Sequence, residues 1–166
     1  MVVDLKKQVA LFVEGPGDSQ VDSAAASQDG FNDIFLMGTD IYMYMEYRSR
    51  KKKRYMYYDE FRGKRIYGLF EAMAEVFLDT KPLFKTRGLP DDVTPQVLKL
   101  YKDFGGNCLV ASWLTADEFR SCLDLAIERY SKDAPEGWLK EYELIYKYLK
   151  DSDDEDEPAR IVFWFD

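Results

Sequence analysis

Histidine is missing from all 166 residues of this chain, and cysteine occurs only at Cys108 and Cys122. Without histidine, neither Ser-His nor Cys-His nucleophilic catalysis is available, and zinc sites that contain histidine are excluded. Two cysteines cannot close a cysteine-rich metal site or form a disulfide scaffold, and their scarcity is typical of a reducing, cytoplasmic environment. We therefore expect a protein that has no metal or other cofactor.

Motifs for nucleotides and membranes are missing as well. The chain contains neither GxxxxGK[ST] nor GxGxxG, and Gly105-Gly106-Asn107 is better explained as a helix stop than as a phosphate cradle. No apolar run approaches the length of about 18 residues that spans a bilayer, and Met1–Lys7 lacks the apolar core of a signal peptide. These absences predict a cytoplasmic protein that does not contact membranes.

Acidic residues outnumber basic residues, 31 against 23, which gives a net charge of −8. Such a surface repels nucleic-acid phosphates, so direct nucleic-acid binding is not expected, whereas a basic protein partner would be attracted. Tyrosine (12) and phenylalanine (11) are abundant. Tyrosine combines a large apolar ring with a polar hydroxyl group, which suits either a contact surface or the rim of a wide core.

Alternating or densely apolar segments bounded by turn residues predict strands. We expect one sheet to contain four of them: Gln8–Glu14, Ile41–Tyr47, Arg54–Tyr58 and Arg160–Phe165. The second and third would form a hairpin, and the last is apolar enough to be central. Two shorter segments, Asp33–Met37 and Asn107–Trp113, also have strand character.

Apolar residues recur at helical spacing in four further segments. These helices are predicted to start near Arg65 (ending before Lys81-Pro82), at Thr94-Pro95, at the capping box Thr115–Glu118, and within Asp133–Glu136. We expect them to pack on one face of the sheet through Phe70, Phe119 and Trp138.

Together, the elements predict an α+β fold with a largely antiparallel sheet of roughly four to six strands, and with about four helices between the hairpin and the C-terminal strand. We expect a single domain over residues 1–166, with a mobile loop at 16–31 and an acidic loop at 151–158.

The predicted hairpin turn is the first candidate binding site. It carries six cations within seven positions: Arg48, Arg50, Lys51, Lys52, Lys53 and Arg54. One interpretation is a site for a phosphate or an acidic partner, and the other is a solvated turn whose charge protects the sheet edge from aggregation. Its charge could be neutralised by an outside anion or by the chain's own acidic run, Asp151–Glu157.

A second group of candidates for ligand or partner binding consists of Arg65, Tyr67, Arg87, Asp92 and Trp113. A structural role is the alternative for Arg65, Tyr67, Arg87 and Asp92: the arginines would brace loop carbonyl groups, and Asp92 would pair with one of the arginines.

Three segments carry a resemblance: Arg65-x-Tyr67-x-Leu69-Phe70, Arg87-Gly88-Leu89-Pro90-x-Asp92-Val93-Thr94-x-x-Val97, and Ser112-Trp113-Leu114-Thr115-x-x-Glu118. Their order and spacing, over about a third of the chain, resemble an uncharacterised family of small phage and prophage proteins. Family members often carry histidines near the last segment, where this chain has Ala111-Ser112-Trp113. The resemblance implies a viral setting, and hence the cytosol of a host cell, without implying a reaction.

The first functional hypothesis is a non-catalytic phage protein that binds and inhibits a host protein, with a defence factor as one candidate and with nucleic-acid mimicry by its acidic surface as one possible means. The second is a small-ligand binder that sequesters a signalling nucleotide between Arg65, Arg87 and the basic turn. The third is a carboxylate-dependent or Toprim-like enzyme, suggested by Leu11–Asp18 with Glu14 and weakened because no Asp-x-Asp follows an apolar strand. We expect no enzymatic activity, and the sequence permits a homo-oligomer.

Overall fold

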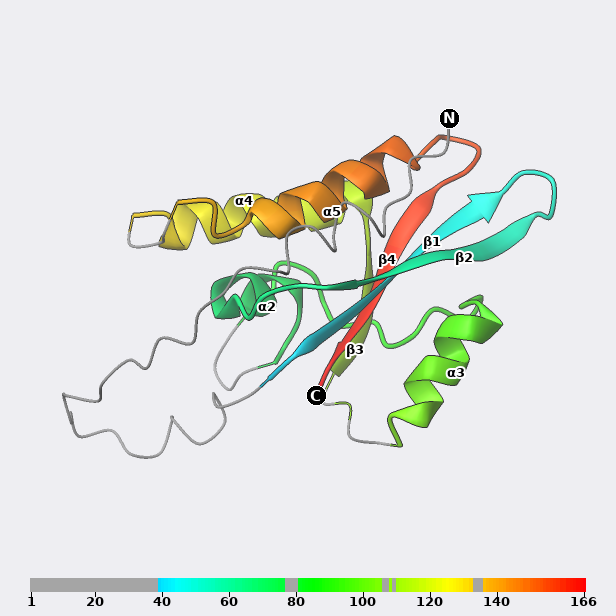
Figure 1. The fold of residues 1–166 in the computed structure, drawn as a ribbon, viewed down its shortest axis with the longest axis horizontal. Helices are drawn as coiled ribbons and strands as arrows, with labels where there is room; N and C mark the ends of the chain where they lie inside the picture. Colours follow the sequence, from blue (N-terminus) through cyan, green and yellow to red (C-terminus); the bar gives the residue numbers. More distant parts are fainter. Residues whose placement is uncertain (1–38, 77–80, 106–107, 109, 133–135) are drawn as a thin grey trace, which may run out of the picture. The chain divides into compact units, whose positions relative to one another are not determined.

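The computed structural model describes residues 39–76, 81–105, 108, 110–132 and 136–166, which belong to one compact unit, Asn32–Asp166. Their elements follow one another along the chain (Figure 1) as β1 (Ile41–Ser49), β2 (Arg54–Arg62), α2 (Tyr67–Met73), α3 (Pro95–Asp103), β3 (Val110–Thr115), α4 (Ala116–Tyr130), α5 (Lys140–Asp151) and β4 (Ala159–Phe165). The predicted strands at Gln8–Glu14 and Asp33–Met37, the predicted loop at 16–31 and Glu14 lie outside the described residues.

The four strands form one sheet in the order β2-β1-β4-β3, and each neighbouring pair is antiparallel. This confirms the α+β class, the hairpin and the central position of the last strand. All seven residues of β4 are buried, because β4 has a strand on each side and is covered on both faces. The predicted strand Arg54–Tyr58 extends to Arg62.

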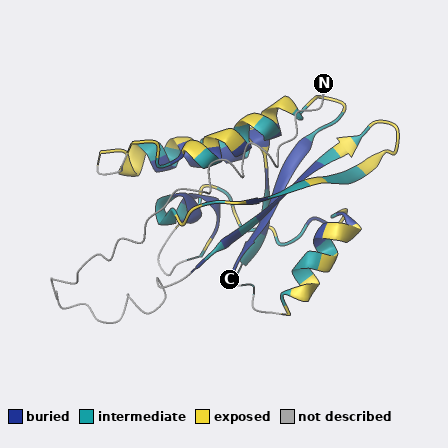
Figure 2. Cartoon of the chain, viewed as in Figure 1, coloured by how far each residue is buried: buried dark blue, intermediate teal, exposed yellow. Residues whose placement is uncertain are grey.

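Helices cover both faces of the sheet, so the prediction that they pack on one face is wrong. Helices α2, α4 and α5 lie on one side, where Phe70 contacts Phe165 with ring centroids 5.0 Å apart. Helix α3 lies on the other side (Figure 2). There Val97 packs in a buried cluster with Val162 and Trp164. Because β4 is apolar at successive positions and side chains alternate between faces, both faces must be shielded from water. Trp138 is only partly buried, whereas Phe70 and Phe119 are fully buried.

The sequence predicts the starts of α3 and α4 correctly, but it misplaces the end of α2 and the start of α5. Thr94 accepts a hydrogen bond from the Val97 backbone N–H at the start of α3, and Thr115 and Glu118 form the predicted capping box of α4. Helix α2 ends at Met73, before the stop predicted at Lys81-Pro82. Helix α5 begins only at Lys140, after a turn with Gly137 at φ +71°. It has no side-chain cap, because the N-cap residue is Leu139, whose side chain cannot accept a hydrogen bond.

Gly63 provides a first test of the packing between the end of β2 and α5. A Cβ atom at this position would lie 2.2 Å from Tyr142 Oη, and Tyr142 Oη itself donates a hydrogen bond to the Lys64 carbonyl oxygen at 2.6 Å. We expect Gly63→Ala to lower the free energy of unfolding by about 1–3 kcal/mol, because the buried ring must move. Urea unfolding measures this, with Lys102→Ala on the exposed face of α3 as control. Unchanged stability would show that the ring moves without cost.

Candidate functional site

The structure places the candidate residues in separate regions. Arg65 contacts Asp40, which immediately precedes β1, whereas the basic turn, Arg48–Arg54, lies at the other end of the same strand. Eight steps at about 3.3 Å per residue separate the ends of β1 by about 26 Å. One copy of the chain therefore does not bring Arg65 and the basic turn into a common pocket.

Arg65 forms a two-point ion pair with Asp40. Its Nε and Nη2 atoms lie 2.6 and 3.0 Å from the two carboxylate oxygens, and both side chains are about half exposed. The hydrogen bond from Arg65 lowers the pKa of the Asp40 carboxyl group. Tyr67 begins α2, and its ring meets the Phe70 ring edge-on. These contacts agree with a structural role for Arg65 and Tyr67.

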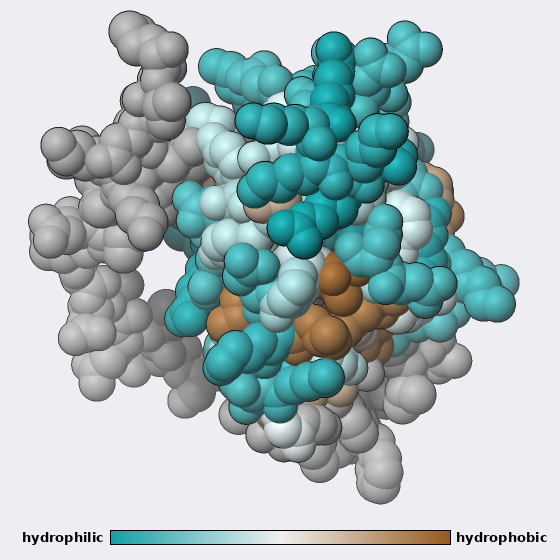
Figure 3. Space-filling view, turned by 90° about the vertical axis from the view of Figure 1, so that its right-hand side faces the viewer, coloured by the Kyte–Doolittle hydropathy of each residue, from teal (hydrophilic) through white to brown (hydrophobic). Residues whose placement is uncertain are grey.

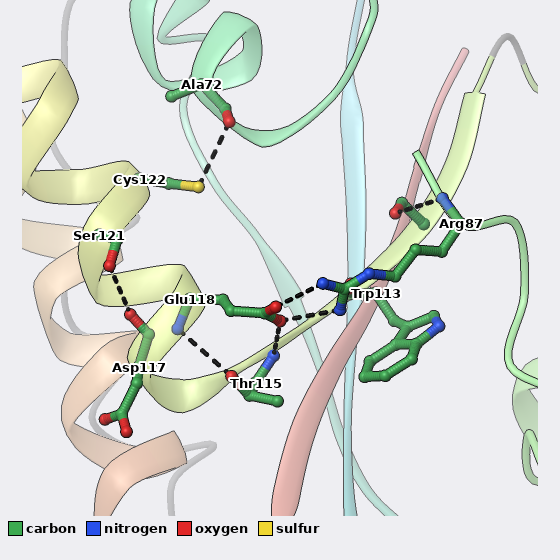
Figure 4. Close-up of polar contacts among 9 residues, drawn as sticks. Ala72, Arg87, Trp113, Thr115, Asp117, Glu118, Ser121 and Cys122 are labelled. Carbon is green, nitrogen blue, oxygen red and sulfur yellow. Dashed lines mark hydrogen bonds and ion pairs between the residues drawn. The ribbon is translucent and has the colours of Figure 1, made fainter. Parts of the chain in front are cut away.

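Arg87 is held between α4 and β3 (Figure 4). Its guanidinium group makes two contacts with the Glu118 carboxylate, and its Cζ atom lies 4.5 Å from the centre of the Trp113 ring. Its backbone N–H donates to Ser112 Oγ at 3.2 Å, and its Nη1 lies 3.5 Å from the Trp113 carbonyl oxygen. The second and third segments of the family-like pattern therefore pack against each other.

Glu118 belongs to both the ion pair and the helix cap. Its Oε2 accepts hydrogen bonds from Arg87 Nη1 at 2.8 Å and from the Thr115 backbone N–H at 3.0 Å. Burial disfavours the charged form of Glu118, but the hydrogen bonds from Arg87 and Thr115 together outweigh it and lower the pKa of the carboxyl group below its usual 4.5. The carboxylate is already engaged by the chain's own donors.

Asp92 is the exposed member of an ionic network whose central pair is buried, and the sequence did not reveal this network. Its Oδ1 lies 2.6 Å from Nη1 of Arg160, not next to Arg65 or Arg87 as expected. Arg160 Nε donates to Glu46 Oε2 at 2.8 Å, and Glu46 Oε1 accepts from the Thr94 backbone N–H at 2.8 Å. Arg160 is 4% exposed and Glu46 0%, so the central pair of this Glu46–Arg160–Asp92 network is withdrawn from water.

A signal for Glu46 and Arg160 was present in the strand pattern. Residues two apart on a strand share a face, so Glu46 follows Tyr44, and Arg160 precedes Val162, on the face that α3 covers. Two opposite charges in strands that are mainly apolar and aromatic point to a buried pair. Only the register, which places Glu46 directly opposite Arg160, shows that they meet.

The basic turn contacts the acidic loop of the same chain. Arg50 Nη2 lies 2.6 Å from Asp154 Oδ1 and 3.1 Å from Asp156 Oδ2, and the Arg50 backbone N–H donates to Glu157 Oε1 at 2.8 Å. We call these four residues the charge clasp. The clasp shows that the chain's own acidic run neutralises part of the charge of the turn. Five cations of the turn have no ion pair with a described residue: Arg48, Lys51, Lys52, Lys53 and Arg54.

Within the described ranges, no group of three or more acidic or cysteine side chains is arranged to hold a metal ion. None of the helices in the described part of the chain is long and apolar enough to cross a membrane.

The buried network predicts that replacing Arg160 destabilises the protein far more than replacing Arg65. We expect Arg160→Met to lower the free energy of unfolding by about 3–5 kcal/mol, because the buried Glu46 side chain would lose its cationic partner. Arg65→Met is the matched control, since it removes an exposed two-point pair and should leave stability nearly unchanged. Urea unfolding compares the two variants. Equal losses would contradict the assignment of the network as a buried determinant of stability.

The Arg87–Glu118 pair predicts a pH-dependent contribution to stability. Glu118→Gln keeps a side chain that can complete the capping box but removes the charge. At pH 7 we expect a loss of about 0.5–1 kcal/mol, reduced by partial solvent exposure. The difference from the wild-type chain should shrink as pH falls from about 4.5 through the lowered pKa of Glu118 in the folded state, because the wild-type carboxylate then becomes protonated as well. Unfolding at several pH values measures this, with Glu128→Gln on the same helix as control.

Comparison with protein-family models, with curated proteins and with solved structures finds no match for this chain.

Proposed function

We propose that this protein is a non-catalytic binding protein of phage type, which binds and inhibits a host protein. The observation that carries the proposal is an incompletely covered apolar area on the side of the molecule that bears the hairpin turn and α3. Figure 3 views this side and shows an apolar area within a mainly hydrophilic surface. Apolar surface surrounded by polar side chains is typical of sites where proteins bind other proteins.

The packing around α3 explains why apolar surface stays accessible. The buried cluster under the helix is small, and the surrounding hydrophobic side chains are only partly buried, among them Tyr57, Val93 and Leu100. They come from β2, from the loop before α3 and from α3 itself. A partner that packed here would complete the burial of these side chains, and tyrosine at such a place is a typical anchor of an interface.

The nucleotide-binding alternative receives less support. A phosphate site needs arginines whose donors are available, but Arg65 is paired with Asp40 and Arg87 with Glu118. A nucleotide would have to displace a carboxylate at each arginine, and Arg65 lies at the far end of β1 from the basic turn. Binding of a protein surface does not require these arginines to be released.

Affinity capture tests the proposal directly. The immobilised protein should retain one bacterial protein at near-stoichiometric yield from a host lysate, and native mass spectrometry of the purified chain should show no bound nucleotide. We expect Leu100→Asp or Tyr57→Ser to weaken capture at least tenfold, because each alters the apolar area. Leu144→Asp is the matched control, because Leu144 is an exposed residue of α5, on the other side of the sheet. Melting curves verify that the variants are folded.

Retention of a nucleotide without any captured protein would overturn the proposal in favour of the ligand-binding alternative. Turnover of a substrate by the purified chain would overturn its non-catalytic character.

A further inference from the structure

The basic turn already binds carboxylates. Within the chain, the Arg50 guanidinium group contacts Asp154 and Asp156, and the Arg50 backbone N–H contacts Glu157. The three acceptors lie within four residues of one acidic loop. The turn therefore recognises a short, carboxylate-rich segment, and the recognised segment happens to belong to the same chain.

The turn is shaped in advance for this contact. The Lys53 backbone N–H donates to the Ser49 carbonyl oxygen at 2.7 Å, and the Lys52 backbone N–H lies 3.3 Å from Ser49 Oγ. Lys53 takes a positive φ of 52°, which closes the turn. The surface beside it has an open depression, lined by Arg48, Ser49, Arg50, Lys53 and Asp156.

Most of the positive charge of the turn is unused by the clasp. All three clasp acceptors converge on Arg50, and the exposed Lys51, Lys52 and Lys53 have no ion pair with any residue in the described ranges. Side-chain exposures of 53% for Arg50 and 58% for Asp154 leave the clasp in contact with water. Exposed ion pairs contribute little to stability, so another acidic group can replace the carboxylates of the clasp at small cost.

We propose that the basic turn is a docking site for an acidic, carboxylate-rich segment of the partner protein, and that Asp154, Asp156 and Glu157 act as an internal competitor that the partner displaces. This inference rests on the proposed function, because it specifies the chemistry of the same partner. The partner segment adds contacts with Lys51–Lys53 that the internal loop does not make.

Charge favours a short acidic peptide over a nucleic acid. The chain has a net charge of −8, and without the six cations of the turn the rest would carry −14. A long polyanion that bound the turn would extend over this negative surface, whereas a short peptide would not. At physiological salt the screening length is about 8 Å, so the turn attracts a short acidic segment with limited repulsion from more distant carboxylates.

A peptide-binding assay tests the inference without knowledge of the partner. The probe is a fluorescent peptide with the chain's own sequence Asp-Ser-Asp-Asp-Glu-Asp-Glu, from positions 151–157, and its neutral counterpart has Asn and Gln instead. In the wild-type chain the tethered loop competes at a high effective concentration, so binding should be weak. The triple change Asp154→Asn, Asp156→Asn and Glu157→Gln opens the clasp and should tighten binding of the acidic peptide about three- to fivefold, because exposed ion pairs compete only modestly. Asp153, whose carboxylate accepts from the Ala159 backbone N–H, is left intact.

Matched variants separate the site from general charge effects. Neutralising Asp103, Glu128 and Glu143 changes the net charge equally and should not tighten binding. Adding Lys51→Ala, Lys52→Ala and Lys53→Ala to the open-clasp variant should abolish peptide binding, whereas Lys85→Ala, Lys102→Ala and Lys147→Ala should leave it unchanged, since these exposed lysines lie elsewhere.

High salt should weaken binding, and the neutral peptide should not bind. If the open-clasp variant fails to fold, the single change Asp154→Asn opens the clasp in part while Arg50 stays intact, and it should tighten peptide binding in the same direction.

Three results would overturn the inference: equal peptide binding by wild-type and open-clasp chains, tighter binding of a single-stranded oligonucleotide than of the peptide, or capture of the host protein that survives the three lysine substitutions. In the last case the proposed function stands and only the docking site is wrong. Peptide binding as expected without any captured host protein supports the site and removes the proposed function.

Discussion

The buried pair between Glu46 and Arg160 is the interaction on which the α3 side of the structure depends. The two residues lie directly opposite each other on the central strands β1 and β4, with almost no exposure to water. Glu46 also accepts the backbone N–H of Thr94, the residue that caps α3, and Arg160 reaches Asp92 two residues earlier. One ion pair thus determines where the loop before α3 meets the sheet and where the helix begins.

Desolvation makes such a pair costly, and an apolar pair of similar volume could be equally stable. An apolar pair could not make the hydrogen bonds that this pair makes to the loop before α3. Glu46 accepts from the Thr94 backbone N–H, and Arg160 donates to the side chain and the carbonyl oxygen of Asp92. The centre of the Tyr55 ring lies 3.5 Å from Arg160 Cζ and adds a contact that a smaller apolar side chain would lack. We infer that the network contributes specificity of packing on a face whose apolar cluster is small.

Three arginines show how exposure separates structural ion pairs from exchangeable ones. Arg160 and Glu46 are 4% and 0% exposed, Arg87 and Glu118 are 29% and 21% exposed, and Arg50 and Asp154 are 53% and 58% exposed. Loss of a partner leaves an uncompensated charge in the core in the first case and a hydrated charge in the last. The pairs that organise the fold are therefore poor candidates for ligand exchange, and the charge clasp is the best one.

The sequence by itself determined the local structure of this protein. Alternation in Ile41–Tyr47, the capping residues Thr94 and Thr115, and the apolar run at the C-terminus are short-range signals, and each corresponds to an observed element. Only the tertiary structure decided which charges meet. Glu46 and Arg160 are 114 residues apart, and Arg50 and Asp154 are 104 residues apart, so strand register and loop placement bring them together. The local pattern also could not predict that helices cover both faces of the sheet. The apolar stripe of a helix indicates that the helix packs against something, but not which face of the sheet it covers.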